Sequence, residues 1–391
     1  MIAPHRLLRI CVTALACLFV AFVTPPARAQ DPSAKRDWQK QPAIVEIDTT
    51  HDIYAVGDPH GDYERLVALL VAAKIMPGDP GPPEKAQWQA GKAVLVCTGD
   101  LINKWDQSLR VIALFRALEV EAAKAGGRVV VTMGNHEAEF LVDPTNGKSV
   151  EFDKELRGKD IDAKDLAAGT DKTGIGAWLR SLPLAARVND WFFSHAGNTK
   201  GRTLAQLRAD LQSGIDKHGF KAPVLLAEDG LLEARLRPEP WWEMPGDMPE
   251  QSVKRLTQGI KALGVRHLVM GHQPAKIMFN DGTKRRAGEL FQFGDGLVFL
   301  IDTGISRGVG FSSGALLHIH VGNKKVRASR IDSTGKSTEI WTAPAAEKST
   351  VSNPSAATKA MHQHIIFHGF HGPIGQAPGA GHLLHANAGN R

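Results

Sequence analysis

Short hydrophobic runs alternate with longer amphipathic stretches along most of the chain. Short runs of apolar and β-branched residues are typical of buried strands, whereas apolar residues spaced three and four apart are typical of helices. We therefore expect strands at residues 43–47, 53–56, 93–98, 128–133, 185–188, 191–194, 266–270 and 298–301. We expect helices at residues 63–74, 107–125, 203–218, 224–237 and 250–263. This alternation predicts an α/β protein with βαβ units.

Three later segments, residues 315–321, 325–331 and 337–341, alternate apolar and polar positions and predict antiparallel strands that close a sheet. Residues 143–172 are rich in charge and interrupt the pattern, so we expect an inserted cap or loop there. Residues 30–42 are polar and predict a loose lead-in. The main domain is therefore expected at residues 43–342.

The first 29 residues have the pattern of a secretory signal peptide. Arg6 and Arg9 precede an apolar run at residues 10–23, and residues 27–29 form a small-x-small cleavage site. The run falls short of the ~20 apolar residues that a bilayer-spanning helix needs. We therefore expect a periplasmic or secreted protein with no stable membrane anchor after cleavage. Cys97 would then be the one remaining cysteine, which excludes an intrachain disulfide.

The C-terminal residues 343–391 become rich in alanine, serine, glycine and histidine without a periodic apolar pattern, which predicts a disordered tail. The tail carries six of the sixteen histidines, at positions 362, 364, 368, 371, 382 and 385. Two interpretations stay open: mobile imidazoles that chelate metal ions together, or a low-complexity extension without a role.

The composition is that of an ordinary globular protein, with 43% hydrophobic and 23% charged residues. The formal charge is +6, but the predicted signal peptide holds three arginines and no acidic residue, which leaves +3 on the rest of the chain. So small an excess, without a block of lysine and arginine, argues against a nucleic-acid partner.

Five short polar segments come where predicted strands end. They are Gly57-Asp58-Pro59-His60-Gly61, Gly99-Asp100-Leu101-Ile102-Asn103-Lys104, Gly134-Asn135-His136-Glu137, Ser194-His195-Ala196-Gly197 and Gly271-His272-Gln273-Pro274. Open α/β sheets build their sites at the carboxyl ends of strands, so these segments are expected to meet. Carboxylates, imidazoles and an amide oxygen together suit transition-metal cations.

In this order the five segments resemble the motifs of the calcineurin-like metallophosphoesterase superfamily. The Gly134–Glu137 and His195–Gly197 segments resemble its phosphoprotein phosphatase (PPP) group, and residues 269–274 with 301–306 are similar to the bacterial Shewanella-like branch. The resemblance covers about residues 44–331. It implies a four-layer αββα sandwich with mixed β-sheets flanked by helices, and a metal-dependent phosphatase.

The resemblance also implies a role for each matching residue. Asp58 and His60 would bind a first metal ion, Asp100 would bridge two, and Asn135, His195 and His272 would bind the second. Two divalent cations of Mn, Fe or Zn suit this ligand set, and a hydroxide between them would attack the phosphate of a monoester. The substrate would be a small phosphomonoester or a phosphoprotein. His136 would give a proton to the leaving oxygen, and Asn135 would also contact substrate.

Two residues depart from the family pattern. Asn103 stands where the family has the aspartate that orients the catalytic histidine, and Lys104 stands where it has a phosphate-binding arginine. A second family arginine has no clear counterpart near residues 240–243. Because many phosphodiesterase branches have histidine at the position of Pro274, the sequence favours monoester hydrolysis. A phosphodiesterase or nucleotide pyrophosphohydrolase on the same scaffold, and a catalytically weak metal-binding protein, stay as alternatives.

Overall fold

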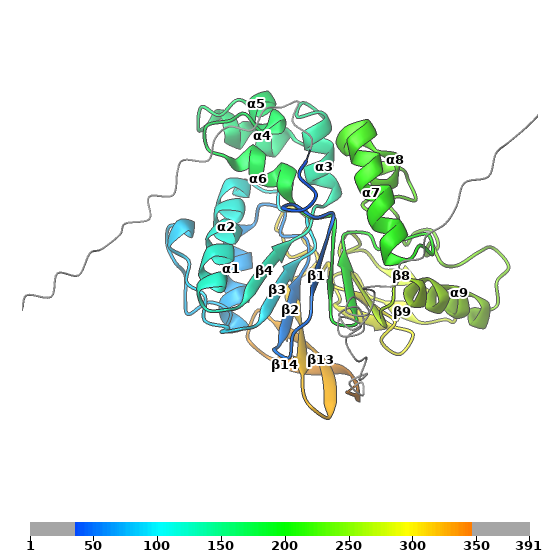
Figure 1. Cartoon of the computed structure of the whole chain (residues 1–391). Coiled ribbons are helices and arrows are strands. Elements are labelled where there is room, and N and C mark those ends of the chain that lie inside the picture. Colours follow the sequence, from blue (N-terminus) through cyan, green and yellow to red (C-terminus); the bar gives the residue numbers. More distant parts are fainter. Residues whose placement is uncertain (1–35, 346–391) are drawn as a thin grey trace, which may run out of the picture. The chain divides into compact units, whose positions relative to one another are not determined.

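The computed structural model describes residues 36–345, in which two six-stranded sheets face each other (Figure 1). The first contains, in order, β1 (Ile44–Ile47), β5 (Ala185–Val188), β6 (Trp191–Ser194), β7 (His267–Met270), β11 (Val298–Leu300) and β10 (Phe291–Phe293). The second contains β14 (Ser337–Pro344), β13 (Lys325–Asp332), β12 (Ala315–Val321), β2 (Ile53–Val56), β3 (Val94–Cys97) and β4 (Arg128–Val131). A separate hairpin pairs β8 (Ile277–Met278) with β9 (Lys284–Arg285).

Strand β3 shows why these runs are hydrophobic throughout. Val94 and Val96 join the core between the two sheets, together with Phe299 of the opposite sheet. Leu95 and Cys97 point the other way and belong to the core that the helices complete. Alternate residues therefore face two different apolar surfaces, which is typical of a parallel strand covered on both sides.

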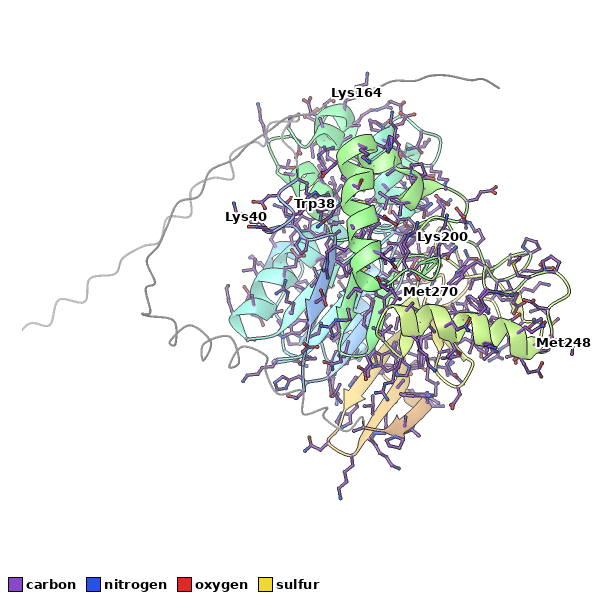
Figure 2. The ribbon with its side chains drawn as sticks, turned by 45° about the vertical axis from the view of Figure 1, so that its right-hand side comes forward. Trp38, Lys40, Lys164, Lys200, Met248 and Met270 are labelled. Atoms are coloured by element: carbon purple, nitrogen blue, oxygen red, sulfur yellow. The ribbon has the colours of Figure 1, made fainter. Side chains whose placement is uncertain are left out.

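Helices cover the outer faces of both sheets, which confirms the predicted four-layer αββα arrangement (Figure 1). The helices are α1 (Tyr63–Ala72), η1 (Pro83–Lys85), α2 (Ser108–Lys124), α3 (Asn135–Val142), α4 (Val150–Arg157), α5 (Ala163–Ala168), α6 (Ile175–Ser181), α7 (Leu204–His218), η2 (Gly219–Lys221), α8 (Pro223–Leu226) and α9 (Pro249–Ala262). Helix α9 reaches outward to the exposed Met248 at its N-terminal end (Figure 2). Among residues 36–345, no helix combines the length and the apolar character needed to cross a bilayer.

The most important difference from the sequence prediction is at residues 224–237, where we expected one long helix. The helix α8 ends at Leu226, and the chain turns back so that the amides of Leu231 and Leu232 donate to the carbonyls of Val224 and Leu225. Gly230 permits this turn, because a Cβ there would lie 2.4 Å from the Leu225 carbonyl oxygen.

The predicted domain limits have different outcomes. The predicted signal peptide and almost all of the predicted tail lie outside the described residues; strand β14 continues to Pro344, two residues past the expected limit at 342. Within the lead-in, the Arg36 guanidinium donates to five carbonyl groups, of Gln41, Pro42, Arg180, Ser181 and Leu182, so residues 36–42 are held against the domain rather than loose. The predicted insertion contains α4 and α5.

Candidate active site

The predicted site residues come from both sheets and meet where the strands end. Asp58 follows β2 and Asp100 follows β3, while Asn135 and His136 open α3 just after β4. From the other sheet, His195 follows β6 and His272 follows β7. A cavity of about 200 Å³ lies between them, lined by Asp58, His60, Asp100, Lys104, Asn135, His136, Lys148, Arg235, His272, Pro274, Asp302 and Val309. His195 is fully buried and contacts the lining residues.

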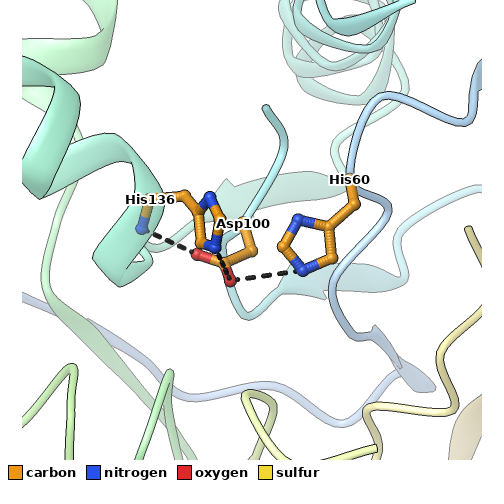
Figure 3. A group of neighbouring side chains, drawn as sticks. All are labelled: His60, Asp100 and His136. Atoms are coloured by element: carbon orange, nitrogen blue, oxygen red, sulfur yellow. Dashed lines mark hydrogen bonds and ion pairs between the residues drawn. The ribbon is translucent and has the colours of Figure 1, made fainter. Parts of the chain in front are cut away.

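Three side chains form a first cluster around one carboxylate oxygen of Asp100 (Figure 3). His60 Nε2 lies 3.4 Å and His136 Nε2 lies 4.0 Å from Asp100 Oδ2. The other ring nitrogen of His60, Nδ1, lies 3.1 Å from the carbonyl oxygen of Ile102. If Nδ1 carries the proton, this bond leaves Nε2 free as a ligand, which is the usual way a metal-binding histidine is oriented.

A second cluster, with Asp100 in common, contains His195 and His272. His195 Nε2 lies 3.4 Å from Asp100 Oδ1, 3.0 Å from His272 Nδ1 and 3.0 Å from Asn135 Oδ1. His195 Nδ1 lies 2.8 Å from the Thr98 carbonyl oxygen, which orients this ring as Ile102 orients His60. Asp100 thus offers one oxygen to each cluster, the arrangement that a bridging ligand requires.

Asp58 belongs to neither cluster by distance, although it lines the same cavity. Its Oδ2 accepts a hydrogen bond of 2.8 Å from the amide of His272, and its buried Oδ1 has no hydrogen-bonding partner. A buried carboxylate oxygen without a partner is costly unless a cation or water meets it. The side chain also needs Gly271, where a Cβ would lie 2.2 Å from this Oδ1. The donors present therefore fit divalent metal ions.

The loops that carry these residues have unusual backbone conformations. His60, Asp100, Asn103, Lys104 and His272 all have positive φ angles, between 41° and 69°. Residues other than glycine adopt this region at a cost that the surrounding structure must offset, and such residues concentrate at functional sites.

The carboxyl group of Glu137 offsets part of this cost. Glu137 Oε1 accepts hydrogen bonds from the amides of Leu101 and Ile102, and Oε2 accepts from those of Asp100 and Gly134. One buried side chain therefore fixes the loop after β3 against the start of α3. Burial, with the nearby Asp100, raises the pKa of Glu137 to about 7.

Burial and the neighbouring charges shift the pKa values of several groups in and around the two clusters. Burial, with the neighbouring carboxyl of Asp302, raises the pKa of Asp58 well above its usual value. Burial acts in the same direction on Asp100, but the facing imidazoles of His195 and His136 hold its pKa well below the usual range. Although burial lowers it, the pKa of His195 is raised to about 10 by Asp100 and Asp58. Asp100 and Asp58 thus stabilise the positively charged form of the buried His195, which shows that a cation is favourable at this place.

Asn103 contacts His136. Its Nδ2 lies 2.9 Å from His136 Nδ1, and the Asn103 side chain is fully buried. An amide that donates to Nδ1 leaves the ring proton on Nε2, the nitrogen that faces Asp100 and the cavity. Burial lowers the pKa of His136 to about 3, and the cationic Lys104 and Lys148 act in the same direction.

Three cations line the cavity, and two of them were missed from the sequence. Lys104 was predicted; Lys148 comes from the insertion, and Arg235 comes from the turn that replaces the expected helix. Glu233 lies behind them: its Oε1 accepts from Asn135 Nδ2 at 2.9 Å and lies 3.9 Å from Lys148, while its Oε2 lies 3.4 Å from Arg235. Nothing in the local sequence pattern separates Glu233 and Arg235 from ordinary surface charges.

Comparison with known proteins agrees with this geometry. The family described as calcineurin-like phosphoesterase matches residues 51–276. Shewanella-like protein phosphatase 1 of Plasmodium berghei is 24% identical over 292 residues, which are 71% of this chain and 74% of that protein. A symmetrical bis(5'-nucleosyl)-tetraphosphatase of Methylococcus capsulatus is 30% identical over 145 residues, which are 37% of this chain and 42% of that protein.

Among solved structures, a cold-active protein-tyrosine phosphatase of a psychrophilic Shewanella species superposes with a TM-score of 0.55. The match covers 76% of this chain and 83% of that protein, at 20% identity, and shows that the two share a fold.

Proposed function

Since the chain belongs to the calcineurin-like phosphoesterase family, we propose that it is an exported phosphatase that hydrolyses phosphate monoesters at a dinuclear metal site. The observation that carries the proposal is the convergence of six candidate ligands, from the ends of five strands in two sheets, at one cavity of about 200 Å³. A structural turn explains any one of these segments, but not their meeting with complementary donor atoms.

The residues divide between two metal positions. Asp58, His60 and Asp100 would hold one ion, and Asp100, Asn135, His195 and His272 would hold the other. When bound, two such cations acidify a water molecule and neutralise the charge on the phosphoryl oxygens. Manganese, iron and zinc all suit this mixture of imidazole, carboxylate and amide donors.

The chain itself supplies substrate binding and proton transfer. Lys104, Lys148 and Arg235 place positive charge at the cavity, where a phosphate dianion would bind. His136 would deliver the proton from Nε2 to the leaving oxygen as an imidazolium, which leaves a neutral ring. In that form Nδ1 also carries a proton, and Asn103 would turn its amide oxygen, which has no other partner, toward it. Arg235 would supply the planar contact with phosphate that Lys104 cannot make.

Turnover of p-nitrophenyl phosphate by the purified Mn²⁺-loaded protein tests the proposal, with bis-p-nitrophenyl phosphate as the comparison. We expect hydrolysis of the monoester and little hydrolysis of the diester. His136→Ala and Asp100→Asn should each lower kcat by at least about a hundredfold. Turnover of both substrates at similar rates would favour the phosphodiesterase alternative, for which the similarity to a bis(5'-nucleosyl)-tetraphosphatase speaks. Two bound metal ions without turnover of any ester would favour a metal-binding protein.

Export is supported by the pattern of residues 1–29. We expect the mature protein to begin at Gln30, as N-terminal sequencing of the protein recovered from the periplasm or medium would show. Retention of residues 1–29 in the cytoplasmic fraction would contradict export without affecting the assigned chemistry.

A further inference from the structure

A second cavity lies next to the active site, and its walls carry positive charge. It has a volume of about 500 Å³. Its lining residues are Arg237, Pro238, Lys276, Ile277, Met278, Lys284, Arg285, Arg286 and Ala287. Five of the nine are lysine or arginine, and none is acidic. We call this the basic cavity.

Most of this charge is not neutralised by the protein. Arg237, Lys276 and Lys284 are exposed and form no ion pair with any residue of the described range 36–345. Arg286 has one acidic neighbour, Glu289, at 3.3 Å. Cations gathered in this way repel one another, so an anion bound among them relieves an existing cost.

The basic cavity and the active site are lined by neighbouring positions of the same two chain segments. Arg235 lines the active-site cavity and Arg237 the basic cavity; in the same way Pro274 lines the first and Lys276 the second. Two residues of backbone reach at most about 7 Å. On each of these two segments, the backbone position that lines one cavity therefore lies within about 7 Å of the position that lines the other.

The buried Arg285 fixes the two walls relative to each other. Its guanidinium donates to the carbonyls of Gln273, which follows His272, and of Asp302, which lines the active site. It also donates to the backbone carbonyls of Ala275, at 3.2 Å, and Glu289, at 2.8 Å. Because these bonds satisfy it, Arg285 supports the cavity, and the exposed cations are the ones left to meet a ligand.

An extended peptide matches this spacing. Residues two apart on one face of an extended chain lie about 6.6 Å apart. With a phosphorylated residue in the active site, the side chain two residues away would reach the basic cavity. Its apolar part, Pro238 with Ile277 and the 57%-exposed Met278, suits the remainder of a peptide better than a bare inorganic anion.

Building on the proposed phosphatase function, we propose that the basic cavity is a specificity subsite for phosphoprotein substrates that carry an acidic side chain two residues from the phosphorylated one. The subsite would favour Asp or Glu at that position over neutral or basic residues. Its contribution would fall with ionic strength, because its cations are exposed.

The test compares two charge-reversal variants of the Mn²⁺-loaded full chain. The first is Lys276→Glu with Lys284→Glu, in the basic cavity. The matched control is Lys324→Glu with Lys325→Glu: Lys324 lies in the turn between β12 and β13, Lys325 is the first residue of β13, and both are exposed. The substrates are p-nitrophenyl phosphate and two phosphotyrosine peptides that differ by Glu or Gln at the second position from the phosphotyrosine.

We expect the unaltered protein to prefer the Glu peptide by about fivefold in kcat/KM, as a few exposed ion pairs allow. The first variant should lose this preference and the control should keep it, while p-nitrophenyl phosphate turnover stays unchanged in both. Equal kcat/KM for the two peptides in the unaltered protein, or a preference that survives in the first variant, would overturn the subsite.

Direct peptide binding separates this inference from the proposed function. Fluorescence anisotropy of the labelled peptides measures the same preference without turnover. A preference for the Glu peptide in a protein that hydrolyses no monoester would refute the phosphatase assignment and keep the subsite. Hydrolysis of monoesters without a binding preference for the Glu peptide would refute the subsite and keep the phosphatase assignment.

Discussion

The contact between Asn103 and His136 gives the sharpest test of the proposed proton donor. Asn103→Asp would place a carboxylate oxygen where the amide now lies, 2.9 Å from His136 Nδ1. A negative charge stabilises the imidazolium form of His136, which an amide cannot do. The change therefore adds the charge that the family's aspartate would supply, with almost no change in side-chain volume.

The size of the effect follows from the distance and the burial. Opposite unit charges about 4 Å apart interact by about 4 kcal/mol at an effective dielectric constant of about 20, which corresponds to about 3 pKa units. Burial now lowers the pKa of His136 to about 3. Some of the gain is offset because the new carboxylate is itself buried, so we expect the pKa of His136 to rise by about 1 to 3 units.

The assay is kcat for p-nitrophenyl phosphate against pH, with metal content measured on the same samples. A proton donor must be protonated, so kcat falls as the pH rises past its pKa; raising that pKa moves the fall to higher pH. Asn103→Asp should therefore shift the descending limb upward by about 1 to 3 pH units and increase kcat near neutrality. Asn103→Ala, which removes the contact without adding charge, should lower kcat without an upward shift. An unchanged profile in a fully loaded Asn103→Asp protein would refute the assignment of His136.

Three further substitutions test neighbouring groups. Glu137→Gln should lower the free energy of unfolding by about 2 to 4 kcal/mol in urea denaturation, because an amide nitrogen would face backbone donors that now have an acceptor. Glu233→Ala should weaken metal binding about tenfold by titration calorimetry, whereas Glu233→Gln, which keeps an acceptor for Asn135, should not. Burial raises the pKa of Glu155 to about 7, so its ionisation costs stability as pH rises from about 4.5 through 7; Glu155→Gln should flatten Tm over that range, and an equally steep profile would contradict it.

The residues at the ends of the buried strands could be predicted because each motif directly follows its strand in the sequence. Asp58 and Asp100 each follow a short apolar run closely, and parallel strands carry such positions to the same edge. The structure brings residues of the five motifs together around one cavity, where Asn103 contacts His136.

Residues brought in by turns and insertions could not be predicted in the same way. The periodicity of residues 224–237 favours a helix, but Gly230 and the hydrogen bonds of Leu231 and Leu232 reverse the chain and carry Glu233 and Arg235 to the cavity. Lys148 has no motif around it. Glu233 is distinguished by its contacts with Lys148 and Asn135, which lie far from it in the sequence. Local sequence patterns cannot predict such contacts.

The division of the candidate ligands between the two sheets links metal affinity to the packing of the whole domain. Asp58, Asp100 and Asn135 depend on one sheet, whereas His195 and His272 depend on the other. Any sliding of one sheet over the other would pull the two halves of the ligand set apart. Conservative changes in the inter-sheet core, such as Val269→Ala, should therefore reduce ion retention, although they leave every donor atom in place. Chelator resistance would then report on the fit between layers as well as on the chemistry of the ligands.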